Sequence, residues 1–248
     1  LSGATRIDTD LSGRASLSTG ERRFTSLLVV DVHGASTLLA RAGLETWAEA
    51  LHLLLSTLCR EVERWGGVVV QARESGLVAA FGAEAAHEDD AERAVLAALG
   101  MSEAFAVAQD DLPAAAREVE LALTVGVTFG EAVVLPRDTD DVTVRTAALA
   151  DADKVQDYVP PGSTWVTEAT YRRVETQFQW AWLGEAIGIG GAPVRLYRPV
   201  ARIDTGAEHE VGGLRAPLVG RDAELQTLTE AVALLRAGIG GIVTVVGE

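Results

Sequence analysis

The sequence predicts an α+β protein built on a ferredoxin-like βαββαβ sheet with its helices on one face. Short runs rich in β-branched residues alternate along the chain with two stretches whose apolar residues recur every three or four positions. Glycines stand at several of the points where one kind of run gives way to the other. The order strand, helix, strand, strand, helix, strand is typical of a ferredoxin-like fold.

The first strand and the first helix have the clearest patterns. Residues 24–30 (FTSLLVV) are rich in β-branched residues and too few for a typical helix, so they predict a buried strand that ends in a turn at residues 31–34. Apolar residues then recur at helical spacing over residues 44–65, and Gly66 and Gly67 predict the end of that helix.

The middle of the chain predicts a hairpin, a second helix and two further strands. Two apolar runs flank a turn near Ser75 and Gly76, as expected for a hairpin. Asp89 and Asp90 precede the helix, where acidic residues interact favourably with the helix dipole. The predicted spans are 68–70 and 77–81 for the hairpin, 91–105 for the helix, 119–128 and 132–135 for strands split by Gly130, and 137–141 for a polar tip.

Smaller elements follow this core. A helix is predicted over residues 146–158, and a Pro-Pro-Gly turn follows at residues 160–162. Short apolar runs then predict strands near residues 164–166, 177–182 and 194–197.

The chain is strongly acidic. Its 36 acidic residues against 21 basic ones give a formal charge of −15, and no cluster of Lys or Arg interrupts this balance. We therefore expect neither nucleic acid nor an anionic membrane surface as a partner. The sequence has no signal peptide and no apolar span of about twenty residues, so a cytoplasmic location is expected. Cys59, the single cysteine, is expected to be a buried core thiol.

Composition divides the chain into four parts. Residues 1–20 are expected to form a polar linker, residues 21–200 the main domain, residues 201–216 a second linker and residues 217–248 the beginning of another domain. The first residue is Leu rather than Met, which suggests a piece excised from a longer protein.

Short motifs in a consistent order carry a resemblance to a known family. The chain resembles a degenerate class III adenylate/guanylate cyclase homology domain. The resemblance implies the class III nucleotidyl cyclase form of the sheet, with extra C-terminal strands and helices. The motifs are residues 27–34 (LLVVDVHG), 64–70 (RWGGVVV), 81–82 (FG), 87–95 (HEDDAERAV), 125–127 (VGV) with 130–131 (GE), and 160–162 (PPG) through 168–171 (EATY).

The end of the chain resembles the entry to a P-loop ATPase of the AAA or STAND type. Such modules follow cyclase homology domains in multidomain bacterial signalling proteins. A helix opening at residues 218–225 precedes an apolar strand at residues 242–246, and Gly247 would be the first glycine of the phosphate-binding loop. The alternative is an ordinary amphipathic tail.

The resemblance implies a metal site in which two aspartates hold two cations during cyclisation of a nucleoside triphosphate. Asp31 matches the first aspartate, although a strand-end Asp that accepts backbone hydrogen bonds is an equal alternative. Ser75 stands at the place of the second, and a neutral hydroxyl cannot replace a carboxylate as a strong ligand for a hard dication. The neighbouring Glu74 would substitute only if the turn shifted.

The resemblance also implies residues that read the base and stabilise the transition state, and most are changed. Gln71 and Ala147 stand where the family has a Lys and an Asp or Thr that read the purine, and Thr146 would help only with a one-residue shift. Ala150 and Lys154 stand where the family has an Asn and an Arg. Lys is a point charge in place of the Arg fork. The other reading of Lys154 is a solvated helix face.

These replacements predict a regulatory pseudo-cyclase domain in intracellular signal transduction, with little or no cyclase activity. We expect a homodimer that controls a downstream ATPase domain of the same protein and senses a nucleotide or another small ligand. No firmly held cofactor is expected, and Mg or Mn with ATP or GTP would bind only if part of the site is retained. The alternative is a divergent purine nucleotide cyclase that uses Asp31 and Glu74. A third reading is a ferredoxin-like domain unrelated to cyclases.

Overall fold

The computed structural model places two compact units in the chain, residues 1–203 and residues 204–248, and each is described by itself. Most of the described residues belong to the first unit. The residues that the structure describes are 21–136, 142–156, 158–188, 191–203, 210–211, 214–215, 222–236, 238, 241 and 244.

The first unit is α+β and is built on a mixed sheet, as the sequence predicts. Within the described residues, eight strands pair in the order β2-β3-β1-β4-β6-β8-β7, with β5 paired to β4. β1 is antiparallel to both β3 and β4, whereas β4 is parallel to β6. The strands are β1 (Glu21–His33), β2 (Val68–Ala72), β3 (Gly76–Phe81), β4 (Ala122–Pro136), β5 (Val142–Arg145), β6 (Thr164–Thr167), β7 (Phe178–Ile187) and β8 (Pro193–Arg202).

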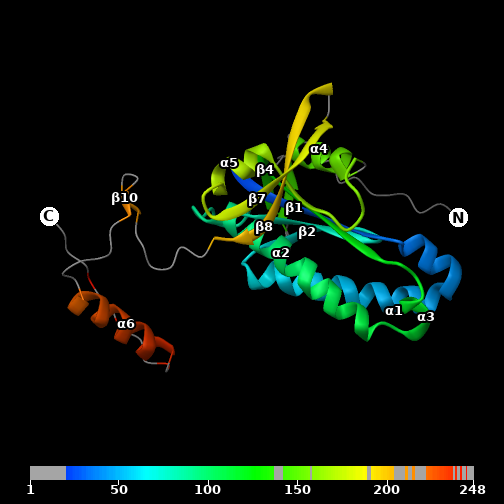
Figure 1. Ribbon diagram of the computed structural model, residues 1–248, viewed down its shortest axis with the longest axis horizontal. Coiled ribbons are helices and arrows are strands. Elements are labelled where there is room, and N and C mark those ends of the chain that lie inside the picture. The colour runs from blue at the N-terminus through cyan, green and yellow to red at the C-terminus, as the bar shows by residue number, and fades with distance from the viewer. Residues whose placement is uncertain are drawn as a thin grey trace, which may run out of the picture. The chain divides into compact units, whose positions relative to one another are not determined.

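Helices cover both faces of this sheet (Figure 1). α1 (Ala35–Arg64) and α2 (Asp90–Ala108) lie on one face, and α4 (Ala147–Gln156) lies on the other. Successive residues of β1 divide between the faces, since strand side chains alternate: Val30 packs in the core beneath α1 and α2, and Val29 packs with α4. The shorter helical elements are η1 (Gln109–Asp111), α3 (Ala114–Arg117) and α5 (Glu168–Val174).

The first strand and the first helix are both longer than predicted. β1 continues past residue 30 through Asp31, and Gly34, with φ of 88°, turns the chain into α1. α1 begins at Ala35 and bends at Gly43, where φ is 84°. Leu44, which the sequence places on the buried face, is 68% exposed just after this bend. The bend therefore breaks the helical register on which that prediction depended.

β4 also differs from its prediction. The two strands expected at residues 119–128 and 132–135 form one strand, Ala122–Pro136, which continues through Gly130. The glycine does not interrupt the strand; instead, it lets α4 approach, because a Cβ at this position would lie 3.1 Å from the Cβ of Ala148. The prediction of a break at Gly130 was wrong because it took a glycine needed for close packing as a turn signal.

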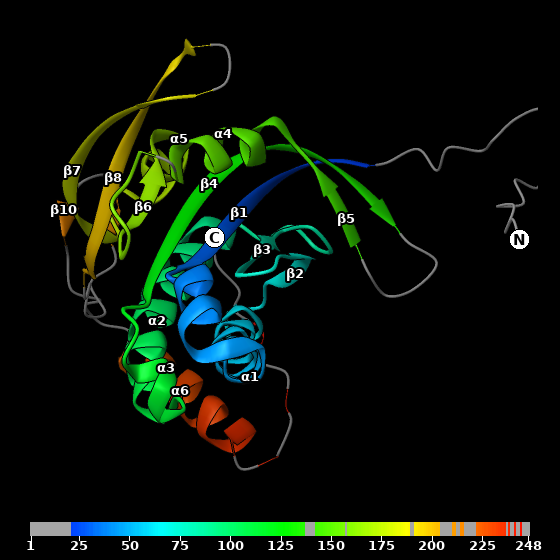
Figure 2. The ribbon, with the colours of Figure 1, turned by 90° about the vertical axis from the view of Figure 1, so that its right-hand side faces the viewer.

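β5 was not predicted, and it pairs with the far end of β4. Figure 2 shows these paired ends extending past the rest of the sheet. The polar tip expected at residues 137–141 lies outside the described residues.

The acidic motif at residues 87–90 begins α2 and ties it to the end of α1. The buried carboxylate of Asp90 accepts a hydrogen bond from the backbone N–H of His87 at 2.8 Å and pairs with the guanidinium of Arg93. Arg93 also donates to the carbonyl of Trp65 at 3.2 Å. The hydrogen bond from Arg93 to Trp65 therefore links the first turn of α2 to the end of α1, and Asp90 offsets the charge of Arg93.

The second unit contains β9 (Glu210–Val211), which pairs antiparallel with β10 (Leu214–Arg215), and the helix α6 (Asp222–Arg236). Gly247 and most of the strand predicted at residues 242–246 lie outside the described residues. Of the helices in the described part of the chain, none combines the length and the apolar character that a membrane span requires.

Candidate functional site

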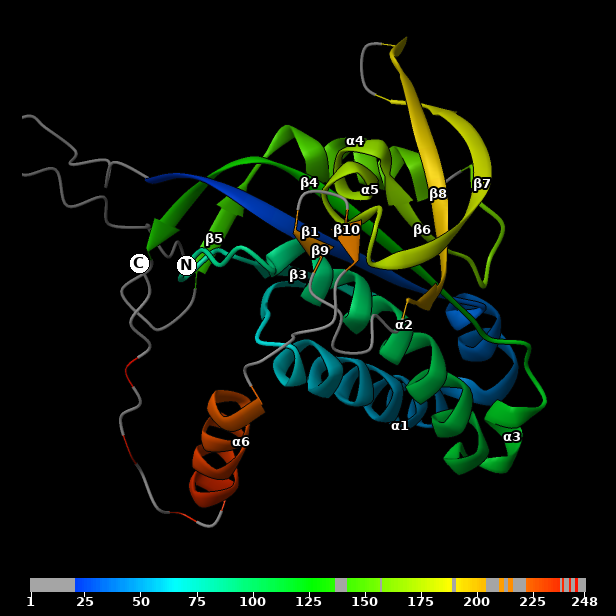
Figure 3. The ribbon, with the colours of Figure 1, turned by 60° about the vertical axis from the view of Figure 1, so that its left-hand side comes forward.

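The candidate metal residues lie where the end of β1 meets the β2–β3 hairpin. Asp31 is opposite Gly76 in the register of β1 and β3. The backbone N–H of Val32 donates to the carbonyl of Ser75 at 2.7 Å. Position 76 requires glycine, because a Cβ there would lie 2.0 Å from the carbonyl oxygen of Val30. The turn therefore lies directly against β1, which runs beside β3 in Figure 3.

Two polar side chains surround the carboxylate of Asp31. The hydroxyl of Ser75 donates a hydrogen bond to Oδ1 at 2.9 Å. On the other side, Nε2 of His33 lies 3.8 Å from Oδ2, which is too long for a hydrogen bond. Nε2 of His33 is buried, and no group of the described residues forms a hydrogen bond with it. The side-chain hydrogen bond that Asp31 accepts thus comes from Ser75, the residue for which the cyclase resemblance implies the place of the second aspartate.

A cavity of about 260 Å³ opens beside Asp31. Glu74 lines it with an exposed side chain, and Leu39 and Trp47 of α1 form an apolar part of its wall. The first turn of α1 also lines the cavity, and the N-terminus of a helix favours anions. None of the described lining residues is a Lys or an Arg, which are the side chains that usually neutralise phosphate groups.

The residues at this site do not fit a centre for two divalent cations. Two dications held close together need several carboxylate oxygens to offset their repulsion. Here Asp31 is joined by a hydroxyl that already donates to it, and Glu74 is exposed to solvent. In the described part of the chain, no three His, Cys, Asp or Glu residues form a group that could hold a metal ion.

The predicted base-reading and transition-state residues lie away from this cavity, and none of them lines it. Gln71 is exposed on β2, at an irregularity in its pairing with β3. Thr146 caps α4: its hydroxyl donates to the carbonyl of Glu131 at 2.7 Å and accepts from the N–H of Ala148 at 3.2 Å. The Thr146 hydroxyl is therefore already used by the backbone.

The other predicted residues lie along α4. Ala147 is its exposed first residue, Ala150 is half-buried, and Lys154 is exposed in its last turn. Asp153, the neighbour of Lys154, forms an ion pair with Arg73 of the hairpin at 2.8 Å. The sequence showed no sign of this contact, which joins the hairpin to α4 within one chain.

A second cavity, of about 450 Å³, lies where the middle of β4 and the end of β6 meet the start of α4. Thr146, Ala147 and Glu168 line it. The pKa of Glu168 is held below its ordinary value by a hydrogen bond from Arg172, and Arg195 adds to this effect. Because Arg172 and Arg195 are exposed and Glu168 is partly exposed, we regard this set as a surface ion-pair network.

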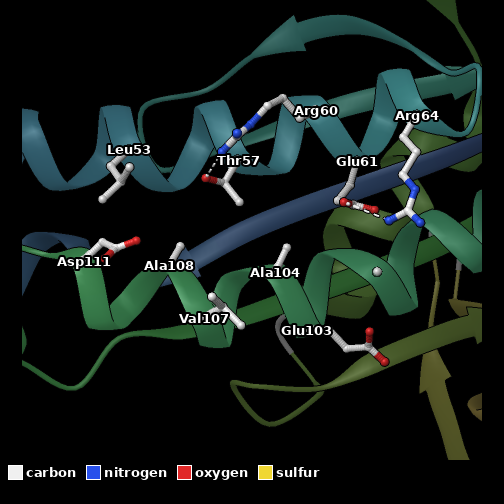
Figure 4. A pocket seen from close by; sticks show the side chains of 11 residues that line it. Leu53, Thr57, Arg60, Glu61, Arg64, Glu103, Ala104, Val107, Ala108 and Asp111 are labelled. Atoms are coloured by element: carbon white, nitrogen blue, oxygen red, sulfur yellow. Dashed lines mark hydrogen bonds and ion pairs between the residues drawn. The ribbon is translucent and has the colours of Figure 1, made fainter.

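A third hollow, of about 560 Å³, is a groove between α1 and α2 (Figure 4). Its walls carry Arg60, which donates to the hydroxyl of Thr57, and Arg64, which pairs with Glu61. None of the predicted site residues lines this groove. The polar groups that line a hollow indicate a binding site better than its size does. The cavity beside Asp31 is therefore the candidate site.

Comparisons with known proteins agree with this fold. No protein-family model matches the chain. A curated relative, the uncharacterized protein R02095 of Rhizobium meliloti (strain 1021), is 27% identical over 246 residues, which are 95% of this chain. The chain spans only 23% of that relative's length.

Solved structures with this fold are cyclase domains. The adenylyl cyclase CyaB from P. aeruginosa is 18% identical, with a TM-score of 0.66 over 78% of this chain and 98% of its own. The guanylate cyclase domain of RhGC from Catenaria anguillulae, solved in complex with GTP, is 19% identical, with a TM-score of 0.63 over 74% of this chain and all of its own.

A third structure is a dimeric guanylyl cyclase domain of the RhoGC fusion protein from Blastocladiella emersonii. It is 17% identical, with a TM-score of 0.63 over 74% of this chain and 99% of its own. The sheet order, the helices on both faces and these matches lead to one conclusion. The chain has the fold of the class III adenylyl and guanylyl cyclase domains.

Proposed function

We propose that this chain is a regulatory domain with a cyclase fold that forms little or no cyclic nucleotide. One observation carries the proposal: Ser75, which the cyclase resemblance aligns with the second metal carboxylate, donates a hydrogen bond to Asp31 at 2.9 Å. Cyclisation needs metal ions that lower the pKa of the attacking 3′-hydroxyl and neutralise the triphosphate. A hydroxyl that donates to the remaining carboxylate cannot supply that charge.

Two alanines at other positions of the implied active site should also lower turnover. Ala150 has no side-chain donor, and Ala147 has no polar group to read a base. Removing one preorganised donor typically lowers kcat by about a hundred- to a thousandfold. Losses at one site are not additive, but together with the missing carboxylate they leave turnover negligible.

The proposed role is to bind a small ligand and to pass that signal to another domain. A domain that keeps the cyclase fold and a cavity beside Asp31 can bind a nucleotide or another small ligand without converting it. The partner that we propose is a downstream ATPase domain of the same intracellular protein, whose activity this domain would control. The length of the Rhizobium relative, of which the chain spans 23%, is compatible with a multidomain protein.

A turnover assay tests the proposal. The 248-residue chain is incubated with ATP or GTP and Mn²⁺, the metal that best tolerates imperfect ligation, and cyclic nucleotide is measured by mass spectrometry. We expect no more product than from Asp31→Asn, because the wild-type chain already lacks the second carboxylate. Product that forms with the wild-type chain and disappears with Asp31→Asn would overturn the regulatory assignment.

The second candidate function is a divergent purine nucleotide cyclase that uses Asp31 and Glu74. The observation in its favour is that both carboxylates line the same cavity. This function requires that Asp31→Asn and Glu74→Gln each abolish product formation. An effect of Asp31→Asn alone would exclude Glu74 as the substitute ligand.

We also propose that the domain forms a homodimer or a weak monomer–dimer equilibrium. The support is the similarity to the dimeric cyclase domain and the extension of β4 and β5 past the sheet (Figure 2). Sedimentation velocity over a hundredfold range of protein concentration should give a sedimentation coefficient that rises with concentration. A purely monomeric species at the highest concentration would contradict this prediction.

A further inference from the structure

We infer that the groove between α1 and α2 binds a small organic molecule that carries a hydrogen-bond donor beside an acceptor, as a primary amide does. Its volume of about 560 Å³ is in the range of small-molecule sites. The groove shares no lining residue with the cavity beside Asp31. The inference therefore goes beyond the proposed function and does not depend on it.

Two buried polar atoms at the end of α1 have no hydrogen-bond partner among the described residues. They are Oε2 of Glu61 and Nε1 of Trp65. A carboxylate oxygen accepts hydrogen bonds and an indole nitrogen donates them. Leaving such atoms unpaired in the interior lowers the stability of the fold, so each one in a native structure needs an explanation. A bound group that donates to Glu61 and accepts from Trp65 would satisfy both.

Both atoms lie next to Gly100 of α2. Glu61 and Trp65 are four residues apart, so their side chains project from the same face of α1. A Cβ at position 100 would lie 2.6 Å from Oε2 of Glu61 and 3.7 Å from Nε1 of Trp65. A glycine inside a helix is less stable than an alanine. Gly100 thus keeps free the point on the groove wall where the unpaired acceptor and the unpaired donor meet.

A single exposed side chain lies over this point. Arg64 pairs with Oε1 of Glu61 at 3.5 Å, and its guanidinium lies 5.7 Å from the centre of the Trp65 ring. The Arg64 side chain is 67% exposed, so this ion pair is weak and Arg64 is free to move aside. Ala104 and the exposed Val107 give the groove an apolar wall for the body of a ligand (Figure 4).

The two unpaired atoms determine the class of ligand. A primary amide presents its NH₂ group as a donor beside its carbonyl oxygen as an acceptor, so it serves Glu61 and Trp65 together. A hydroxyl group offers both functions on one atom and has less reach. A hydrocarbon offers neither, and it would leave both buried atoms unpaired.

NMR titration of the whole chain tests the inference. The reporter is the indole N–H signal of Trp65, which is identified among the five tryptophan signals by its loss in Trp65→Phe. The probes are benzamide, benzyl alcohol and toluene, which share a ring and differ in their polar group. Benzamide should shift the Trp65 signal saturably, and benzyl alcohol should bind more weakly. Toluene should bind at least about tenfold more weakly than benzamide.

Two substitutions at the site and one control complete the test. Gly100→Ala should abolish the benzamide response, because the added methyl group occupies the shared point, and the other indole signals report whether the variant is folded. Glu61→Gln should weaken benzamide binding at least about fivefold, since hydrogen bonds to an ionised acceptor are stronger. Glu63→Gln is the matched control, because Glu63 is exposed on α1 and does not line the groove.

Glu63→Gln should bind benzamide within about twofold of the wild type, because it leaves both unpaired atoms in place. A Trp65 signal that no probe shifts would overturn the inference. Equal responses to the three probes, or a benzamide response that persists in a folded Gly100→Ala variant, would also overturn it.

Discussion

Gly126→Ala should lower the free energy of unfolding by about 2 to 3 kcal/mol. Gly126 lies in the middle of β4, between Val29 of β1 and Trp165 of β6 in the strand register. A Cβ at position 126 would lie 2.1 Å from the indole ring of Trp165, which is fully buried. The ring packs with Ala152 and Val155 of α4, so it cannot move away without displacing that helix. Urea denaturation followed by circular dichroism measures the loss.

A double-mutant cycle shows whether the clash with the Trp165 ring causes the destabilisation by Gly126→Ala. Trp165→Leu alone should destabilise the protein by leaving a cavity, but the added methyl group of Gly126→Ala should partly fill it. The double variant should therefore lose less unfolding free energy than the sum of the two single losses, by at least about 1 kcal/mol. Gly130→Ala is the comparison on the same strand: its Cβ would lie 3.1 Å from the Cβ of Ala148, a milder clash than at position 126, so its loss should be smaller than that of Gly126→Ala. Additive losses in the cycle would contradict this account of β4.

Ser75→Asp should not create cyclase activity, although it puts a carboxylate where the cyclase resemblance implies the second metal ligand. Ala150 would still lack the side-chain donor, and each such missing donor lowers kcat by about a hundred- to a thousandfold. Ala147 and Gln71 would still lack the family's base-reading groups. With ATP or GTP and Mn²⁺, product should stay at the level of Ser75→Asn, a variant of similar size without the charge.

The assay of Ser75→Asp has a defined detection limit if the cyclase CyaB is run in parallel. Stabilisation of Ser75→Asp by Mn²⁺ without turnover would separate metal binding from catalysis. Easily measured turnover from this single substitution would show that the changes at Gln71, Ala147 and Ala150 matter far less than proposed.

The order of the main elements could be predicted from the sequence because most of them have a strong local pattern, whereas β5 was not predicted. The hairpin on either side of Ser75 and Gly76 has two short apolar runs and a turn position that accommodates only glycine. The boundaries were harder to predict. Gly43 and Gly130 are both glycines inside regular elements, where one bends a helix and the other lets a helix approach a strand. Tertiary packing, which a local pattern does not report, decides between these roles.

The candidate site was predictable only in part. Counting from Gly66 and Gly67 places Ser75 beside Asp31, and the structure brings these two residues into a hydrogen bond. The capping role of Thr146 and the ion pair of Arg73 with Asp153 were missed. Both depend on how α4 packs over the sheet, and residues 73 and 153 are 80 positions apart. No spacing rule relates residues at that separation.

The most direct test of the central claim counts the metal ions that the site can hold. The chain is saturated with Mn²⁺ and an ATP analogue that cannot cyclise, and electron paramagnetic resonance is used to detect a magnetically coupled pair of ions. With Ser75 donating to Asp31, we predict no coupled pair. A coupled pair in the wild-type chain that disappears in Asp31→Asn would contradict the account and support a working two-metal cyclase site.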